Sequence, residues 1–416
     1  MEITIAGFIW IVIVMFSYMK KNIKYMFGTL ITCMTFQGCN VLIIGEKGIG
    51  PGILTALIFI SYVFIRGNFK IKTIKRDIKI YSPLFILALI PTISCLINGC
   101  IADTWLVLLQ LIVYVLCFYS IQCGIKILDC ITVYKTARNL AVFHCWFAFI
   151  QFLTTTEFLP LRPVLNVLVF NDMSENIVFH WPNYDRMLST FMEPSYFAVF
   201  LVGAFYYFLS QKEKWKKNYL LLGTIFCEIL MTKSSTAYGA FFLMGLLFVC
   251  FSNTFSLKQK TIIVIGSITF LAVLYLGFYS LIDAVILSKS DSASFRQRVK
   301  FNMNAMSVFR TSPLFGIGYK QCRGSSIIYS LLGEIGILGL FAYLWFNVSI
   351  FFNKIYKYSS QLFPTKLAVA SAMIAQILAC PDLDLCSYWI WIFIYGSVIQ
   401  KRKEHISKYL NHIISM

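Results

Sequence analysis

Seven cationic side chains gather in one stretch of this sequence, between residues 281 and 325. They are Lys289, Arg296, Arg298, Lys300, Arg310, Lys320 and Arg323. The same stretch holds only two acids, Asp283 and Asp291, so pairing within it cannot neutralise the excess charge. Guanidinium groups bind phosphate and carboxylate oxygens through two parallel hydrogen bonds. The composition of this stretch therefore predicts a site that holds an anion.

The elements that must position this stretch are apolar. The chain has 416 residues, of which 59% are hydrophobic and 13% charged, and its mean hydropathy is +0.75. This predicts an all-α polytopic membrane protein with a single integral membrane domain over residues 1–416. Runs able to cross ~30 Å of hydrocarbon recur about thirteen times, in a range of about 11–14. They lie near residues 3–19, 25–44, 49–65, 80–97, 104–122, 137–155, 195–210, 218–232, 237–251, 261–280, 326–352, 366–380 and 387–399.

The positive charges give the orientation. Of the 36 basic residues, 25 fall in alternate loops, from the lysines at 20–24 to the basic group at 401–408, and this pattern predicts that those loops are cytoplasmic. Nine of the other eleven lie in two large loops, 156–194 and 281–325, which are then periplasmic. The cations of these loops could instead contact lipid head groups or pair with nearby acids. The net charge of +18 does not indicate nucleic acid, because the orientation rule accounts for most of it.

Several kinds of chemistry leave no trace in the sequence. The four histidines are scattered and the thirteen cysteines show no metal-ligand spacing, so we expect neither a metal nor another cofactor. A phosphate-binding GxxxxGK[ST] loop is absent, which argues against a nucleotide-driven pump. The triplet from Asp382 to Asp384 is similar to metal-binding acids of sugar-nucleotide transferases, but so short a match is common by chance. A disulfide among Cys322, Cys380 and Cys386 stays open.

Two stretches resemble a known family. The first is RMLSTFMEPSYFA, residues 186–198, and the second runs from Arg296 through PLFGIGY, residues 313–319, to GEIGILGL, residues 333–340. Together they look like the O-antigen polymerase and O-antigen ligase superfamily of bacterial inner-membrane enzymes, which has the same motifs in the same order. The resemblance covers roughly residues 180–345. Taken separately, each motif could be a turn or a close helix contact made by glycine.

The resemblance implies a GT-C-like fold and a glycosyltransferase of lipopolysaccharide biosynthesis that needs no metal. Such an enzyme moves an oligosaccharide from undecaprenyl diphosphate to a sugar hydroxyl at the periplasmic face of the inner membrane. The expected partners are this lipid-linked oligosaccharide, membrane lipid and a chain-length regulator protein. The first candidates for binding the diphosphate are Arg186, Arg296 and Arg298. The second-tier candidates are Lys300, Arg310, Lys320 and Arg323.

Three residues are candidates for acid–base or positioning roles. Glu193 stands before Pro194 and Ser195, where it would cap the next helix and so be a weak base that positions Arg186 or a substrate hydroxyl. Glu334, near the outer end of its span, and His180, in the first large loop, remain alternatives for the general base. The sequence does not choose among them.

Alternative functions remain beside the polymerase. Ligases of the superfamily carry a histidine nine residues before the glutamate, but counting back from Glu334 gives Ser325, which favours the polymerase branch. A flippase for the same lipid-linked oligosaccharide would have similar length and span number. Flippases should line an internal cavity with charges and show two related halves, neither of which is evident here. The enzyme interpretation therefore stands above the transporter.

The charge pattern predicts the topology of the chain. A reporter fused after Lys75 or Lys216 should be cytoplasmic, and one fused near Asp172 or Ser290 should be periplasmic. Alkaline phosphatase and fluorescent-protein fusions measure this directly. Placement of residues 160–190 and 285–320 on opposite faces would contradict a shared site.

Overall fold

The computed structural model describes residues 2–44, 47–66, 71–124, 128, 130–156, 158–171, 186–211, 214–252, 255–277, 293–352 and 362–398. Its helices are α1 (Ile5–Met19), α2 (Ile23–Cys33), α3 (Pro51–Arg66), α4 (Ile71–Asn98), α5 (Ala102–Gly124), α6 (Cys130–Thr155), α7 (Arg162–Leu168), α9 (Pro194–Leu209), α10 (Trp215–Met231), α11 (Ser235–Phe251), α12 (Leu257–Gly277), α14 (Ala293–Thr311), α15 (Ile327–Phe352) and α16 (Leu362–Ala379). A further helix spans Cys386–Val398. Each expected apolar run overlaps one of these helices.

The chain is a helical membrane protein. Among the described residues, four segments are long and apolar enough to cross a membrane, namely Tyr81–Asn98, Ala102–Gln122, Ile327–Phe352 and Leu362–Ala379. Shorter apolar helices accompany them, and large hydrophobic side chains such as Phe8, Phe16 and Leu109 are exposed. Apolar side chains on an outer surface are stable where lipid replaces water. The number of spans stays a prediction.

One expected range is corrected. The run at 25–44 is not one helix, because α2 ends at Cys33 and turns follow it. A small antiparallel sheet, which the sequence did not indicate, then joins β1 (Glu2–Ile3), β2 (Leu42–Ile44) and β3 (Lys47–Ile49) in that order. Eleven helical residues rise only ~16 Å, which is too short to cross the hydrocarbon alone.

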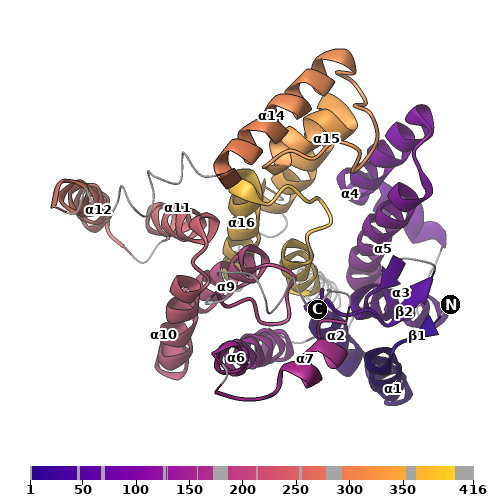
Figure 1. The fold of residues 1–416 in the computed structure, drawn as a ribbon, viewed down its shortest axis with the longest axis horizontal. Helices are drawn as coiled ribbons and strands as arrows, with labels where there is room; N and C mark the ends of the chain where they lie inside the picture. Colours follow the sequence, from indigo (N-terminus) through magenta and orange to yellow (C-terminus); the bar gives the residue numbers. More distant parts are fainter. Residues whose placement is uncertain are drawn as a thin grey trace, which may run out of the picture.

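Helices that are apolar on every side form the core. Figure 1 shows α9 and α16 at the centre, with α14 and α15 along one edge and α3 to α5 on another side. In α9 nearly every side chain from Phe197 to Phe208 is buried, and the helix Cys386–Val398 is equally enclosed. An all-apolar helix is stable only when neighbours surround it. Gly203 permits a close approach of these two helices, because a Cβ there would lie 2.3 Å from the indole nitrogen of Trp391.

The connecting segments gather at two ends of the bundle. At one end, hydrogen bonds join Gln37 to Thr190 (3.2 Å), Met187 to Met231 (3.3 Å), and Asn98 to Gly316 (3.3 Å). We call this the site end. On the other loop set, Tyr134 bonds Asn218 at 2.6 Å, and the Lys214 ammonium lies 3.5 Å from the Tyr134 ring centroid. The segments that meet at the site end are those that the charge pattern groups on one side.

The two glycine-containing motifs interlock at the site end. Gly336 has φ +66° and ψ −167°, which breaks α15 inside its length. Backbone groups that the break leaves without helical partners bond the 313–318 turn. Ile337 N–H donates to Pro313 O at 2.9 Å, and Gly318 N–H donates to Glu334 O at 2.9 Å. A Cβ on Gly336 would lie 2.3 Å from Leu314 O, and one on Gly316 would lie 2.4 Å from Glu334 O. Only glycine fits these two positions.

A methyl group at Gly336 should therefore destabilise the protein strongly. We expect Gly336→Ala to cost more than the ~1–3 kcal/mol of the backbone conformation alone, because the Cβ also collides with a carbonyl. Gly223→Ala is the matched control, since no atom lies within 4 Å of a Cβ there and alanine favours the helix. Thermal unfolding of the detergent-solubilised protein measures both. Equal melting temperatures for the two variants would contradict the interlock.

Candidate functional site

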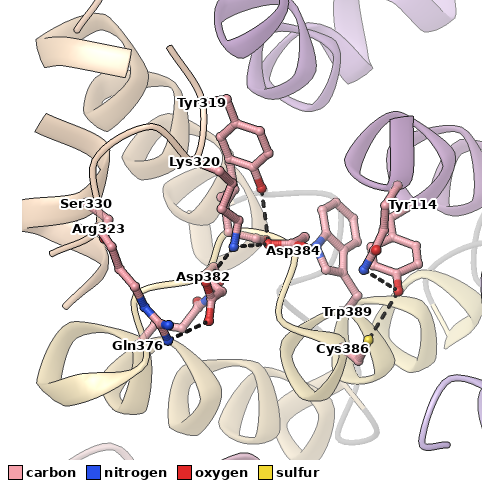
Figure 2. Close-up of polar contacts among 12 residues, drawn as sticks. Tyr114, Tyr319, Lys320, Arg323, Ser330, Gln376, Asp382, Asp384, Cys386 and Trp389 are labelled. Carbon is pink, nitrogen blue, oxygen red and sulfur yellow. Dashed lines mark hydrogen bonds and ion pairs between the residues drawn. The ribbon is translucent and has the colours of Figure 1, made fainter. Parts of the chain in front are cut away.

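A partly buried ion bridge joins two loops at the site end. The Lys320 ammonium lies 2.5 Å from Asp382 Oδ1 and 2.8 Å from Asp384 Oδ1, as Figure 2 shows. Lys320 follows the interlocked 313–318 turn, whereas the two aspartates lie in the turn between α16 and the helix Cys386–Val398. Lys320 has φ +59°, a conformation that a side chain with a Cβ adopts only when its surroundings hold it. The ion bridge supplies that hold.

Neutral donors fix the aspartate turn from several sides. Tyr196, at the start of α9, donates its hydroxyl to Asp382 Oδ2 at 2.5 Å, and Tyr319 donates to Asp384 Oδ1 at 3.1 Å. Two side chains also bond the turn's carbonyls, Gln376 to Asp382 O at 2.8 Å and Trp389 to Leu383 O at 3.0 Å. Buried carboxylates are stable when hydrogen bonds satisfy their remaining lone pairs. These hydrogen bonds therefore fix the position of the turn and stabilise its two carboxylates.

The charges of the bridge support one another. Burial alone would lower the pKa of Lys320, but Asp384 and Asp382 raise it above its ordinary value. Burial would likewise raise the pKa of Asp382, but Lys320 holds it below its ordinary value. Both groups are therefore charged at neutral pH. The sequence predicts Lys320 as a second-tier diphosphate ligand, and in the structure two carboxylates engage its ammonium.

Arg323 stands at the exposed edge of this bridge. Its guanidinium Nη2 lies 3.9 Å from Asp382 Oδ2, and its side chain is 57% exposed, compared with 25% for Lys320. Burial lowers the pKa of Arg323, but Asp382 raises it above its usual value. A long ion pair of this kind leaves most guanidinium donors directed elsewhere. Arg323 therefore fits an anion-binding role better than Lys320 does.

Arg186 lies within electrostatic range of both Arg298 and Glu193. Arg186 donates from Nε to Thr232 O at 2.9 Å, which anchors its stem. Burial lowers the pKa of Arg186, Glu193 opposes this effect and Arg298 adds to it. Glu193, Asp382, Arg298 and Arg323 all lie within electrostatic range of the Cys380 thiol, so they belong to the same region of the structure. We call Arg186, Arg298, Arg323 and Glu193 the charged cluster.

The remaining cations of α14 lie on other faces of the helix than Arg298 does. Ala305 is fully buried and packs against Gly333 of α15, where a Cβ would lie 3.2 Å from the Ala305 Cα. A helix turns ~100° per residue, so Arg298, two turns earlier, lies on the same face as Ala305. Arg296 and Lys300 each stand two residues from Arg298, which places them on the opposite face. Arg310, five residues after Ala305, also lies well away from that face. The sequence ranks Arg296 with Arg298 as first candidates for the diphosphate, and Lys300 and Arg310 after them, whereas the helix separates Arg298 from the other three.

Hydrogen bonds from other segments hold residues 186–193 in place. Gln151 Oε1 accepts hydrogen bonds from the backbone N–H of Ser189 at 2.9 Å and of Leu188 at 3.3 Å. The His144 ring nitrogen Nδ1 lies 2.9 Å from Ser189 Oγ, and Thr190 donates to Thr35 O at 2.9 Å. Ser189 has φ +53°, which these bonds stabilise. The clamp fixes the chain between Arg186 and Glu193.

The three acid–base candidates have different settings. Glu193 takes the N-cap position of α9, yet its side chain bonds no helical N–H and instead accepts from Ser195 Oγ at 2.9 Å. Its carboxylate is exposed at the charged cluster. Glu334 is 4% exposed, lies beneath the interlocked turn and bonds the Lys320 backbone. His180 lies outside the described residues. Of the two described carboxylates, that of Glu193 is the more accessible.

Sequence reasoning dismissed the acids that organise the site. In the sequence alone, the triplet from Asp382 to Asp384 looks like a chance match, and it does not single out Tyr196 or Tyr319. The available signal was charge complementarity, because two acids lie in a short turn at the same end as a loop rich in cations. Among the described residues, no three His, Cys, Asp or Glu side chains gather as a metal site.

Loss of the Lys320 charge should destabilise the protein in a pH-dependent way. Lys320→Gln leaves two partly buried aspartates without their partner, and we expect a loss of about 2–4 kcal/mol, just below the cost of breaking a fully buried pair. The depressed pKa of Asp382 means that the bridge's stabilisation is present above about pH 4 and is lost as pH falls further. The melting-temperature difference from wild type should therefore be large at pH 7 and shrink in acid. The exposed Lys300→Gln is the control, and equal losses in both variants would contradict the bridge.

No known family model matches the chain, and no curated protein matches it significantly. The resemblance to O-antigen polymerases and ligases therefore remains an expectation from short motifs. The site geometry is the physical basis for a function.

Proposed function

We propose that the chain is a surface-polysaccharide polymerase of the O-antigen type. It moves the growing oligosaccharide from undecaprenyl diphosphate onto a lipid-linked repeat unit, and the site end faces the periplasm of a bacterial inner membrane. The observation that carries this proposal is the charged cluster, in which the exposed carboxylate of Glu193 interacts electrostatically with Arg186 and Arg323, and Arg298 interacts with Arg186. The guanidinium groups would hold an anionic leaving group, and the carboxylate of Glu193 would hold a hydroxyl.

The donor side is built from arginine. When the glycosidic bond to a lipid diphosphate breaks, negative charge develops on the departing oxygen and must be stabilised. Arg186, Arg298 and Arg323 offer planar donors on three separate segments, and Arg186 is already anchored through Nε to Thr232. Groups fixed before the substrate arrives stabilise the transition state without reorganising. A metal ion is not needed for this part of the reaction.

The acceptor side is assigned to Glu193. Its carboxylate faces outward, takes a hydrogen bond from Ser195 and lies within electrostatic reach of Arg186. Both residues are described, and no ion pair joins them directly. In that setting Glu193 orients the attacking sugar hydroxyl and receives its proton as the new glycosidic bond forms. Glu334 and His180 stay alternatives for the base.

The polymerase is favoured over the ligase by the residue at position 325. Ser325 stands where ligases of the superfamily have histidine, and its backbone N–H donates to Asn302 Oδ1 at 2.8 Å. A serine there supplies no imidazole for transfer to a lipid A core. A flippase would need charges along a path between the two ends, whereas the charged cluster lies at one end.

Deletion of the gene and electrophoresis of surface polysaccharide tests the function. A polymerase mutant retains a single repeat unit on the core, a ligase mutant attaches none, and a flippase mutant accumulates carrier-linked unit inside the cell. We expect the first pattern.

Complementation of this deletion tests the arginines. Arg298→Lys should reduce polymer roughly 10–100-fold at unchanged protein level, because an ammonium cannot form the bidentate contact. Arg296→Lys, on the opposite face of α14, should complement almost fully. Full activity of Arg298→Ala would show that Arg298 takes no part in the transfer.

A further inference from the structure

Two cysteines lie at the C-terminal end of α4, next to Gly318 and Tyr319. Gly99 follows the helix with φ +61°, and the N–H of Cys100 donates to the carbonyl of Cys95 at 3.2 Å. This is the 6→1 bond of a Schellman motif, in which Cys95 occupies C3 and Cys100 occupies C″. The side chains at these two positions characteristically touch. Here both of them are thiols.

The contacts around the pair agree with this geometry. The thiols of Cys95 and Cys100 interact with one another, and the Cys95 sulfur accepts the backbone N–H of Tyr319. The Cys100 sulfur lies against Gly318, where a Cβ would be only 2.3 Å from it. A disulfide requires Cα atoms roughly 4.4–6.8 Å apart, and the 6→1 hydrogen bond holds Cys95 and Cys100 together at the same helix end. With their thiols in contact, the pair is placed for a disulfide.

Other cysteines at this end have different neighbours. Cys322 accepts a hydrogen bond from Asn304 at 3.7 Å, and Cys386 lies 3.1 Å from the hydroxyl of Tyr114. Cys380 is buried within the charged cluster. The disulfide left open among these three from the sequence has no support from their contacts.

We propose that Cys95 and Cys100 form a disulfide in the mature protein, and that this bond braces the turn that carries Lys320. The proposal rests on the proposed function, because that function places the site end in an oxidising compartment. The sulfurs support Gly318 and Tyr319, which directly precede Lys320. A covalent bond between them fixes this support relative to the end of α4.

The chemistry balances with a protein disulfide of a thiol oxidoreductase as oxidant. Cys100 is partly exposed, so its thiolate attacks one sulfur of that disulfide, forms a mixed disulfide and releases one oxidoreductase thiolate. The buried Cys95 then loses its proton and attacks the Cys100 sulfur, which expels the second thiolate. Two cysteine thiols lose two electrons and two protons in total. The oxidoreductase gains both electrons, and its two thiolates take up the two protons.

Sequential alkylation of the full chain tests the proposal. Membranes are quenched in acid and denatured, thiols are blocked with light N-ethylmaleimide, disulfides are reduced, and the released thiols take a heavy label before peptide mass spectrometry. Cys95 and Cys100 should carry more than 80% heavy label, on the order expected for a structural disulfide resistant to reduction. Cys117, a buried cysteine of α5, should carry the light label and serves as the internal control.

A second variant identifies the partner. Cys100→Ser should convert Cys95 entirely to light label, since its only partner is removed. Light label on both residues in the wild type, or heavy label on Cys95 in Cys100→Ser, would overturn the proposal. The readout does not use polymer formation: light label in a strain that makes polymer rejects the disulfide alone. Heavy label on both cysteines in the wild type, together with an unchanged polysaccharide in the deletion strain, rejects the proposed function alone.

Discussion

The site depends on a single electrostatic constraint, the neutralisation of Lys320 by Asp382 and Asp384 between two loops that are distant in sequence. Removing a charge from water costs several kcal/mol, and the cost is recovered only with close geometry and satisfied lone pairs. The distances of 2.5 and 2.8 Å and the hydroxyls of Tyr196 and Tyr319 meet that condition. The bridge brings the turn after α16 against the loop before α15. Arg323 is then held at the edge of the charged cluster.

The position of Lys320 depends in turn on two glycines. Gly336 opens α15 so that its backbone can bond the 313–318 turn, and Gly316 lets that turn approach Glu334. A strained Lys320 at φ +59° is stable because the interlock holds one side of it and the aspartates hold the other. The motifs PLFGIGY and GEIGILGL are therefore two halves of one structural unit. Their role is to position charge, and the arginines that could bind substrate come from neighbouring segments.

The sequence predicted those parts of the fold that follow from hydropathy and charge. Apolar runs located the helices, because burial in lipid or core demands them. It failed where the outcome depends on tertiary contacts. Lys320 and Arg298 look alike in a count of cations. Lys320 is nevertheless paired with aspartates, whereas Arg298 belongs to the charged cluster. The break after Cys33 and the small sheet also depend on pairing between Glu2–Ile3 and residues 42–44, which local pattern does not reveal.

Binding of undecaprenyl diphosphate to the purified full-length protein in nanodiscs tests the central claim most directly, because it isolates the anion site from the transfer. Charge-assisted hydrogen bonds contribute roughly 1.5–3 kcal/mol each, which corresponds to about 10–100-fold in affinity. The account predicts losses of that size for Arg298→Gln and Arg323→Gln, and little change for Arg296→Gln and Arg310→Gln. Equal losses across all four variants would show that the cations act only as a diffuse positive surface and would contradict the site described above.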